Sequence, residues 1–296
     1  MTPTVSVVIP TYNRWPFVGD AVDSVLAQSY TDFELIIADD GSTDDTATQL
    51  VKFGSRLKLL RQTNRGAASA RNFAVNEARG RYLAFLDSDD LWLPKKLEIQ
   101  INFMERNPSV QICQAEEIWV RNGVRVNPKA KHRKPSGDIF ARSLELCLVS
   151  PSAVLMTREL FCRVGGFDES LPVCEDYDLW LRIAVDSAVP LITQPLVIKR
   201  GGHADQLSRS TWGLDRYRVM ALQKLLSSNL EVGQRSLVFA VLRRKIAVLA
   251  SGARKRGKLR EADAYESILA GFARESIVGK RDSGLYSGEG VSRGHA

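Results

Sequence analysis

The chain has 296 residues, 44% of them hydrophobic and 25% charged, which is ordinary for a globular protein. This length predicts one large α/β domain with an appendage, or two domains. Four widely spaced cysteines without a C-x-x-C pair argue against a zinc site or a disulfide framework. The sequence contains no run of roughly 20 apolar residues, which a membrane-spanning helix needs. It also starts without a signal-peptide pattern, so we expect a cytoplasmic location.

The net charge of +7 is distributed unevenly along the chain. Residues 1–198 contain 22 Lys and Arg against 25 Asp and Glu, whereas residues 199–296 contain 19 against 9. This shift in composition predicts a boundary near residues 199–210. We therefore expect an α/β domain over 1–210 and a helical extension over 211–278. The tail 279–296, which is rich in Gly, Ser and charge, is predicted to be disordered.

The first third of the chain alternates predicted strands and helices. The strands are expected at 5–9, 33–38, 57–61 and 82–86. The helices between them are expected at 16–29, from Asp44 or Asp45 to about 53, and at 67–77. Such alternation predicts a Rossmann-like, three-layer α/β/α architecture with a mostly parallel sheet.

The rest of the chain gives a mixed pattern and then a helical one. A helix is predicted at 91–107, two strands within 110–126 joined by a turn at Asn122-Gly123, a basic loop at 129–135, a helix at 175–185 and a strand at 191–199. Beyond residue 212 the pattern predicts helices at 212–228, 234–252 and 259–274.

Three carboxylates, Asp87, Asp89 and Asp90, directly follow the apolar run 83–86. Carboxylates this close repel one another unless a positive charge lies between them. A divalent cation such as Mg²⁺ or Mn²⁺ would supply that charge, since hard cations prefer carboxylates and phosphate oxygens. The alternative is that one of these residues caps a following helix.

Polar residues also follow the first two predicted strands. Right-handed crossovers place the carboxyl ends of parallel strands at one edge of the sheet, so residues 10–14, 39–42 and 87–90 should meet there. A carboxylate such as Asp39 at this edge would accept hydrogen bonds from a ribose or a base. The alternative for residues 39–42 is a turn followed by a helix cap.

Two further features, Asp176 and His203, are candidates for chemistry. Asp176 lies at the start of a predicted helix, where it would either favour the helix dipole or deprotonate an incoming hydroxyl. His203 lies in a Gly-rich segment, either near a ligand or as an ordinary polar surface residue.

Taken together, these segments resemble the inverting family 2 glycosyltransferases of the GT-A fold. The resemblance covers about residues 1–210. It is carried by Val-Ser-Val-Val-Ile-Pro-Thr-Tyr-Asn-Arg at 5–14, the loop at 38–46, Asn64-Arg65-Gly66 with Ala70-Arg71-Asn72, the D-x-D-like 86–90, and Gly165-Gly166-Phe167-Asp168 with Glu175-Asp176.

The resemblance implies a role for each matching residue. Asp89 would be the main metal ligand, completed by His203, and Asp176 the general base. Phe167 and Trp180 would shape the acceptor pocket. The nucleotide would be bound by Pro10, Thr11, Tyr12, Arg14, Asp39, Asp40, Arg71, Asp87 and Ser88.

The function implied is metal-dependent, inverting transfer of a sugar from a nucleotide-diphospho-sugar, UDP being expected, to a hydroxyl acceptor. The acceptor would be a glycan or a lipid-linked glycan in cell-surface polysaccharide or glycolipid synthesis. One alternative is a sugar-phosphate nucleotidyltransferase, although residues 10–20 lack its Gly-rich loop. Another is a catalytically inactive binding protein of the same fold. Nucleic-acid binding is not expected, because the basic tail lacks an aromatic stacking platform.

The basic segment 243–260 has two interpretations. A basic amphipathic helix would make peripheral contact with an anionic membrane at its inner face. A solvated helical hairpin packed on the domain, or a dimer contact, is the alternative, since runs of charge usually form solvated faces.

Overall fold

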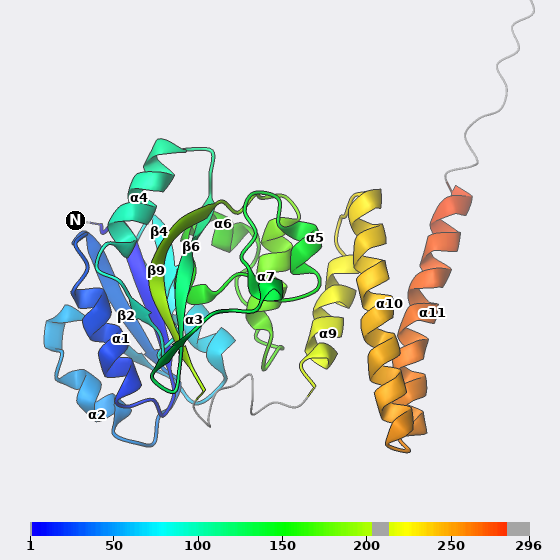
Figure 1. Cartoon of the computed structure of the whole chain (residues 1–296), viewed down its shortest axis with the longest axis horizontal. Helices are drawn as coiled ribbons and strands as arrows, with labels where there is room; N and C mark the ends of the chain where they lie inside the picture. Colours follow the sequence, from blue (N-terminus) through cyan, green and yellow to red (C-terminus); the bar gives the residue numbers. More distant parts are fainter. Residues whose placement is uncertain (1, 203–212, 283–296) are drawn as a thin grey trace, which may run out of the picture. The chain divides into compact units, whose positions relative to one another are not determined.

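The computed structural model describes residues 2–202 and 213–282. The chain forms two compact units, Met1–Val238 and Phe239–Ala296. Among the described residues, one sheet of nine strands forms the centre of the first unit, in the order β3-β2-β1-β4-β8-β6-β9-β5, with β7 beside β6 (Figure 1). The strands are β1 (Val5–Thr11), β2 (Phe33–Asp39), β3 (Lys58–Arg61), β4 (Tyr82–Phe85), β5 (Leu91–Trp92), β6 (Ile112–Arg121), β7 (Val124–Val126), β8 (Val154–Thr157) and β9 (Leu191–Gly201).

The first four strands form the predicted parallel sheet. β1 pairs in parallel with β2 and β4, so that Val5 lies opposite both Phe33 and Tyr82. β2 in turn pairs in parallel with β3. The other half of the sheet is mixed, since β8 is antiparallel to both β4 and β6, while β9 is parallel to β6. The hairpin predicted at Asn122-Gly123 is confirmed by the antiparallel pairing of β6 with β7.

Helices surround this sheet at most of the predicted positions. Those of the first unit are α1 (Phe17–Leu26), α2 (Thr46–Val51), α3 (Ala67–Asn76), α4 (Lys96–Arg106), α5 (Phe140–Ser143), α6 (Arg158–Arg163), α7 (Glu175–Ala184) and α9 (Asp215–Leu226). The helix predicted at 91–107 begins later than expected. Leu91 and Trp92 instead pair with Ile198 and Val197 of β9, so this apolar pair completes the edge of the sheet.

Alternation along the buried strands supplies both faces of the sheet with apolar side chains. On one face, Val5, Val7 and Ile9 of β1 pack in one cluster with residues of α1 and α4. On the other face, where α3 lies against β1 and β2, the rings of Phe85, Phe161 and Phe167 are in mutual contact, with centroids 5.4–5.7 Å apart. The predicted α/β/α layers are therefore confirmed (Figure 1).

The described part of the second unit is a pair of helices. It contains most of α10 (Val232–Lys255) and all of α11 (Leu259–Asp282), which extends beyond the predicted end at 274. Ala250 and Ala253 of α10 pack against Ala262 of α11, and Arg254 forms an ion pair with Glu266 at 2.6 Å. A helical hairpin is thus present, as one of the two interpretations of this basic segment requires. Among the described residues, every helix is too short or too polar to cross a bilayer.

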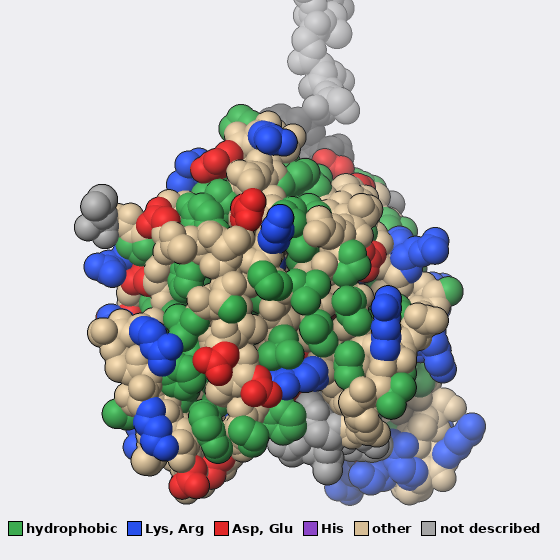
Figure 2. Space-filling model, turned by 60° about the vertical axis from the view of Figure 1, so that its left-hand side comes forward, with side chains coloured by type: hydrophobic (Ala, Val, Ile, Leu, Met, Phe, Trp, Pro, Cys, Tyr) green, Lys and Arg blue, Asp and Glu red, His purple; other side chains and the backbone are tan. Residues whose placement is uncertain are grey.

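The face of the molecule shown in Figure 2 carries Lys and Arg side chains interspersed with Asp, Glu and apolar side chains. Such a mixture is usual for a surface in contact with water.

Lys96 is a fully buried lysine in the first unit. Its side chain is fully buried at the start of α4, with the ammonium group 3.8 Å from the centroid of the Trp92 ring. The ammonium group donates a hydrogen bond to the carbonyl oxygen of Val154 at 3.2 Å. Burial lowers the pKa of Lys96 from 10.5 to about 7.

We expect Lys96→Met to remove a pH dependence of stability. Below pH 7 the lysine is charged in both the folded and the unfolded chain. Between pH 7 and 10.5 the unfolded chain binds a proton that the folded chain does not, so the free energy of unfolding rises with pH. Urea unfolding of the wild type should gain up to roughly 1.4 kcal/mol per pH unit relative to the variant. The exposed neighbour supplies the control, Lys95→Met, and an equal pH dependence in both variants would contradict the assignment.

Candidate active site

The carboxyl ends of β1, β2 and β4 open into a cavity of about 760 Å³, which we call the large cavity. It is also lined by the first turns of α3 and α7, by the end of β9 and by α9. The three polar segments expected to meet at one edge of the sheet are thus brought together. Of the residues selected from the sequence, it is lined by Pro10, Thr11, Tyr12, Arg14, Asp40, Arg71, Asp87, Ser88, Asp89 and Asp176.

Side-chain hydrogen bonds connect the loops that follow β1 and β2. The amide of Asn13 donates to Ser42 Oγ at 2.9 Å, and the amide of Arg14 donates to Thr46 Oγ1 at 3.0 Å. In the other direction, Asn13 Oδ1 accepts from the amide of Thr43 at 2.7 Å. These bonds fix the loop containing Tyr12 and Arg14 against the second strand end.

Asp40 organises the segment before α3. Its two carboxylate oxygens accept hydrogen bonds from Gln62 Nε2 at 2.7 Å and from the amides of Arg65 and Gly66 at 2.9 and 2.7 Å. Gly66 has a φ of 93°, a conformation that glycine adopts without strain. Asp40 therefore shapes the wall of the large cavity through the backbone.

Asp39, by contrast, does not line the cavity and is fully buried. Its Oδ1 accepts a hydrogen bond from the amide of Ser42 at 2.9 Å, and Arg61 Nε lies 3.4 Å from Oδ2. Among the described residues, Asp39 Oδ2 belongs to the small set of buried polar atoms without a hydrogen-bond partner, as do Thr11 Oγ1 and Arg71 Nε. Such atoms beside a cavity are where a polar ligand would gain most.

Arg71 joins three parts of the site. It extends from α3 with its side chain 6% exposed, and it forms ion pairs of 2.7 Å with Asp87, after β4, and with Glu175, at the start of α7. Its guanidinium also lies over the ring of Phe167, 5.1 Å from the centroid. Burial acts to lower the pKa of Arg71, but the two carboxylates raise it above its ordinary value, so the cation persists.

The three neighbouring aspartates have different surroundings. Asp90 is buried and accepts hydrogen bonds from Ser152 Oγ at 2.6 Å and from the amide of Arg200 at 2.9 Å. Asp87 is paired with Arg71. Asp89 lines the cavity, and burial together with the charge of Asp87 raises its pKa. The protein thus supplies positive charge of its own to this cluster, so repulsion between the carboxylates does not by itself require a metal ion.

The helix-cap interpretation of this cluster is wrong, because Leu91 and Trp92 continue as a strand and α4 begins at Lys96. Among the residues that the structure describes, no group of three or more His, Cys, Asp or Glu side chains is placed to hold a metal ion. Asp89 and Asp87 nevertheless suit a hard cation whose remaining ligands are phosphate oxygens of a substrate. The predicted ligand His203 lies outside the described residues.

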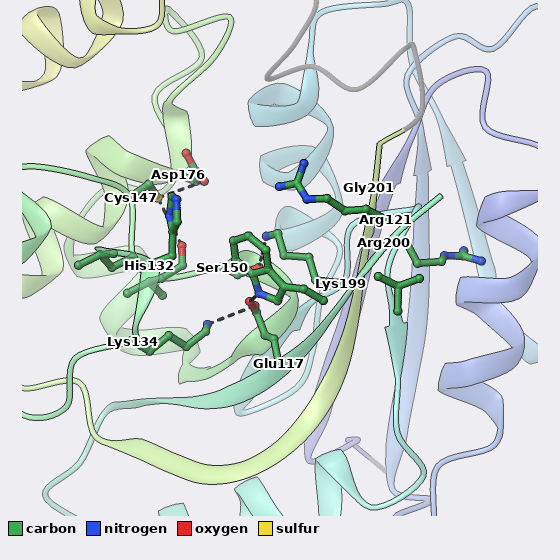
Figure 3. Close-up of a pocket in the computed structure, with 14 residues that line it drawn as sticks. Glu117, Arg121, His132, Lys134, Cys147, Ser150, Asp176, Lys199, Arg200 and Gly201 are labelled. Atoms are coloured by element: carbon green, nitrogen blue, oxygen red, sulfur yellow. Dashed lines mark hydrogen bonds and ion pairs between the residues drawn. The ribbon is translucent and has the colours of Figure 1, made fainter. Parts of the chain in front are cut away.

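Asp176 lies between the large cavity and a second cavity of about 290 Å³, which we call the small cavity. The amide of Tyr177 donates to Asp176 Oδ1 at 2.7 Å, and the thiol of Cys147 donates to Oδ2 at 3.3 Å (Figure 3). Burial and the charge of Asp176 raise the pKa of Cys147, which keeps this thiol protonated as a donor. The carboxylate therefore has a fixed orientation and faces both cavities.

The sequence did not reveal two basic residues of the site, Lys199 and Arg218. Lys199, near the end of β9, lines both cavities and donates to Ser150 Oγ at 3.0 Å. Burial acts to lower its pKa, but Glu117, Asp90, Asp87 and Asp176 raise it. Arg218 of α9 lines the large cavity. A cation at the carboxyl end of a predicted strand was the available signal for Lys199, whereas Arg218 enters through tertiary packing alone.

The prediction that Phe167 and Trp180 shape the acceptor pocket was wrong. Both side chains are 2% exposed in the core, and neither lines the large or the small cavity.

A model of the family described as glycosyl transferase family 2 matches residues 6–164. The chain belongs to this family. An Escherichia coli relative, named UDP-Glc:alpha-D-GlcNAc-diphosphoundecaprenol beta-1,3-glucosyltransferase WfgD, is 33% identical over 221 residues, which are 74% of this chain and 83% of that protein. An uncharacterized glycosyltransferase of Rickettsia felis is 36% identical over 200 residues, 65% of this chain, and the chain spans 32% of that longer protein.

Solved structures support the GT-A fold of this family 2 glycosyltransferase. S. aureus TarS 1–349 in complex with UDP-GlcNAc superposes with a TM-score of 0.66 at 19% identity, over 92% of both chains. Mannosyltransferase PcManGT from Pyrobaculum calidifontis, in complex with GDP-Man and Mn²⁺, gives a TM-score of 0.55 at 21% identity, over 94% of this chain and 81% of that one.

We expect Arg71→Met to lower the free energy of unfolding by about 3–5 kcal/mol, because it leaves Asp87 and Glu175 without their buried partner. Urea unfolding measures this loss. The control is Arg65→Met, which removes an ion pair with Glu169 from an arginine side chain that is 62% exposed. That change should cost about 1 kcal/mol or less. Similar losses in the two variants would contradict the role given to Arg71.

Proposed function

We propose that this glycosyltransferase moves a sugar from a nucleotide-diphospho-sugar to a hydroxyl of a lipid-linked glycan acceptor, with inversion at the anomeric carbon. The observation that carries the proposal is the position of Asp176 between two cavities, a large one with strand-end polar groups and a small one beside it. A general base must face both the donor sugar and the incoming hydroxyl. Asp176 meets this requirement.

The large cavity is proposed to bind the donor. Its walls include the β1 loop, the turn shaped by Asp40, and Arg71, and ligands of open α/β sheets bind at the carboxyl ends of the strands. Asp39 is fully buried and has one oxygen without a hydrogen bond, so it would have to become exposed to accept a bond from the nucleobase of the donor. UDP is the expected nucleotide, since the TarS complex contains UDP-GlcNAc and the WfgD name specifies UDP-Glc.

The acceptor is proposed to carry a lipid diphosphate, as in the printed name of WfgD. Cell-surface polysaccharide or glycolipid synthesis is the corresponding setting. Contact of the basic hairpin α10–α11 with an anionic membrane at its inner face would suit such an acceptor and remains a prediction.

In the proposed reaction, the acceptor oxygen attacks C1 of the donor sugar from the side opposite the diphosphate. The bond between this oxygen and C1 forms as the bond from C1 to the phosphate oxygen breaks, and the electron pair of the broken bond leaves with the nucleoside diphosphate. Asp176 receives the acceptor proton. Lys199, which its carboxylate neighbours keep protonated, and Arg71 offset negative charge near the leaving group.

Asp89 and Asp87 are the residues proposed to hold Mg²⁺ or Mn²⁺. A bound cation would act as a Lewis acid toward the diphosphate oxygens. The Mn²⁺ in the mannosyltransferase structure supports this proposal.

Two alternative functions, a sugar-phosphate nucleotidyltransferase and a catalytically inactive binding protein, are less well supported. Membership in a family of glycosyltransferases argues against a sugar-phosphate nucleotidyltransferase. An inactive binding protein would not need a carboxylate held by two donors between two cavities, as Asp176 is held.

The variant Asp176→Asn tests the base. Transfer to the acceptor should fall by roughly 10²–10⁴-fold, because the amide cannot take up the proton. Binding of the nucleotide-sugar, measured by calorimetry, should stay unchanged. The matched control is Asp186→Asn, an exposed aspartate just beyond α7 and outside both cavities. Full turnover of Asp176→Asn would remove this residue from the mechanism.

A thermal-shift screen tests the donor and the cation together. UDP-sugars with Mn²⁺ should raise the melting temperature more than GDP- or dTDP-sugars, because a ligand that binds the folded state stabilises it. EDTA should abolish most of this shift and the transferase activity, and Mg²⁺ or Mn²⁺ should restore both. A cation at Asp89 would be excluded if the UDP-sugar raised the melting temperature equally with Mn²⁺ and with EDTA, and equally in the wild type and in Asp89→Asn.

A further inference from the structure

The small cavity contains a buried polar network that the proposed donor site does not use. It lies between β6, the loop 129–135 and β9, and Cys147 and Ser150 form part of its wall. Glu117 and Lys134 form an ion pair at 3.2 Å with side chains 3% and 6% exposed. Trp119 Nε1 donates to Glu117 Oε2 at 3.1 Å, which fixes the half-buried indole in the cavity wall.

The residues that line this cavity include more Lys and Arg than Asp and Glu. Its lining contains four Lys and Arg, namely Arg121, Lys134, Lys199 and Arg200, against the two carboxylates of Glu117 and Asp176. Figure 3 shows that Arg200 points away from the cavity centre, consistent with its ion pair to Asp20, whereas Lys199 reaches between the two carboxylates.

Arg121 and His132, which both line the cavity, contact the ring of Trp119. Arg121 is exposed and lies over Trp119, with its guanidinium carbon 5.7 Å from the ring centroid. His132 packs against the same ring at 5.6 Å. Burial and then the charges of Lys131, Arg121 and Lys129 lower the pKa of His132, so all three cations act on this imidazole.

Sugars are bound by aromatic rings together with buried charged groups, and phosphates by Arg and Lys. The small cavity offers Trp119 with Glu117 and Lys134 for the first purpose. Arg121, which lines the cavity, and the exposed Lys131, which directly precedes the lining residue His132, serve the second. Its opening toward Asp176 would place a hydroxyl of the bound sugar beside the base.

We propose that the small cavity is the acceptor subsite, which holds the acceptor's terminal sugar against Trp119 while Arg121 and Lys131 bind the phosphate attached to that sugar. This inference rests on the proposed function, because it assigns the two parts of the acceptor to residues of this chain. It makes the loop 129–135 and the end of β6 determinants of acceptor choice.

Acceptor binding in the presence of UDP tests the inference without relying on turnover. The probes are a short-chain polyprenyl-diphospho-N-acetylglucosamine and an alkyl glycoside of the same sugar, both titrated by calorimetry. The wild type should bind the diphosphate probe more tightly. Arg121→Gln with Lys131→Gln should reduce this preference about tenfold, as expected for the loss of charge-assisted hydrogen bonds.

The control is Arg125→Gln, an exposed arginine on β7 of the same hairpin that does not line the cavity. It should leave the preference unchanged. Equal binding of both probes by the wild type, or equal effects of the control and the double variant, would overturn the phosphate assignment.

Trp119 tests the sugar part. Trp119→Ala should weaken both probes about tenfold, whereas Trp119→Phe should retain most of the affinity because it keeps a ring in the wall. Unchanged affinity in Trp119→Ala, with an unchanged melting temperature, would overturn the sugar assignment. UDP-sugar binding is measured separately in each variant. If the wild type did not bind the UDP-sugar, the proposed function would be contradicted. If it bound the UDP-sugar but the acceptor tests failed, only this inference would be contradicted.

Discussion

The double ion pair of Arg71 is the interaction on which the site depends. One guanidinium joins α3, the loop after β4 and the start of α7, because it binds Asp87 and Glu175 at the same distance of 2.7 Å. Glu175 immediately precedes Asp176, so the position of the proposed base follows from a contact made by its neighbour. The burial of three charges is costly, but each lies in contact with an opposite charge, and the arrangement offsets much of that cost.

A feature of this structure could be predicted from the sequence when it follows from the pattern of strands and helices. It could not be predicted when it depends on contacts between residues far apart in the chain. The meeting of Thr11, Asp40 and Asp87 followed from alternating strands and helices, because parallel strands share one edge for their carboxyl ends. The pairing of Leu91 with β9 could not be predicted, since two residues carry no periodicity. The role of Asp90 was also inaccessible, because its partners Ser152 and Arg200 lie 62 and 110 residues away in the sequence.

The two cavities differ in how the chain builds them. The large cavity is formed mainly by short loops after the parallel strands, whose conformations are fixed by the hydrogen bonds of Asn13 and Asp40 to neighbouring loops. The small cavity depends on β6, β9 and a basic loop between them, which meet through long-range pairing. Recognisable motifs therefore describe the first cavity well. The second is described by its charged residues and by one tryptophan, which could be changed without disturbing the parallel half of the sheet.

Asp90 has a consequence for recombining relatives of this protein. Its carboxylate belongs to the loop after β4, yet both of its hydrogen-bond donors, the Ser152 hydroxyl and the Arg200 amide, belong to the mixed half of the sheet. A chimaera that exchanges that half between two family members therefore inherits a buried carboxylate from one parent and its donors from the other. Exchanges should carry the serine at position 152 along with the aspartate. The backbone amide of residue 200 is present in any exchanged half, whereas loss of the Ser152 hydroxyl would leave one buried oxygen of Asp90 without its donor.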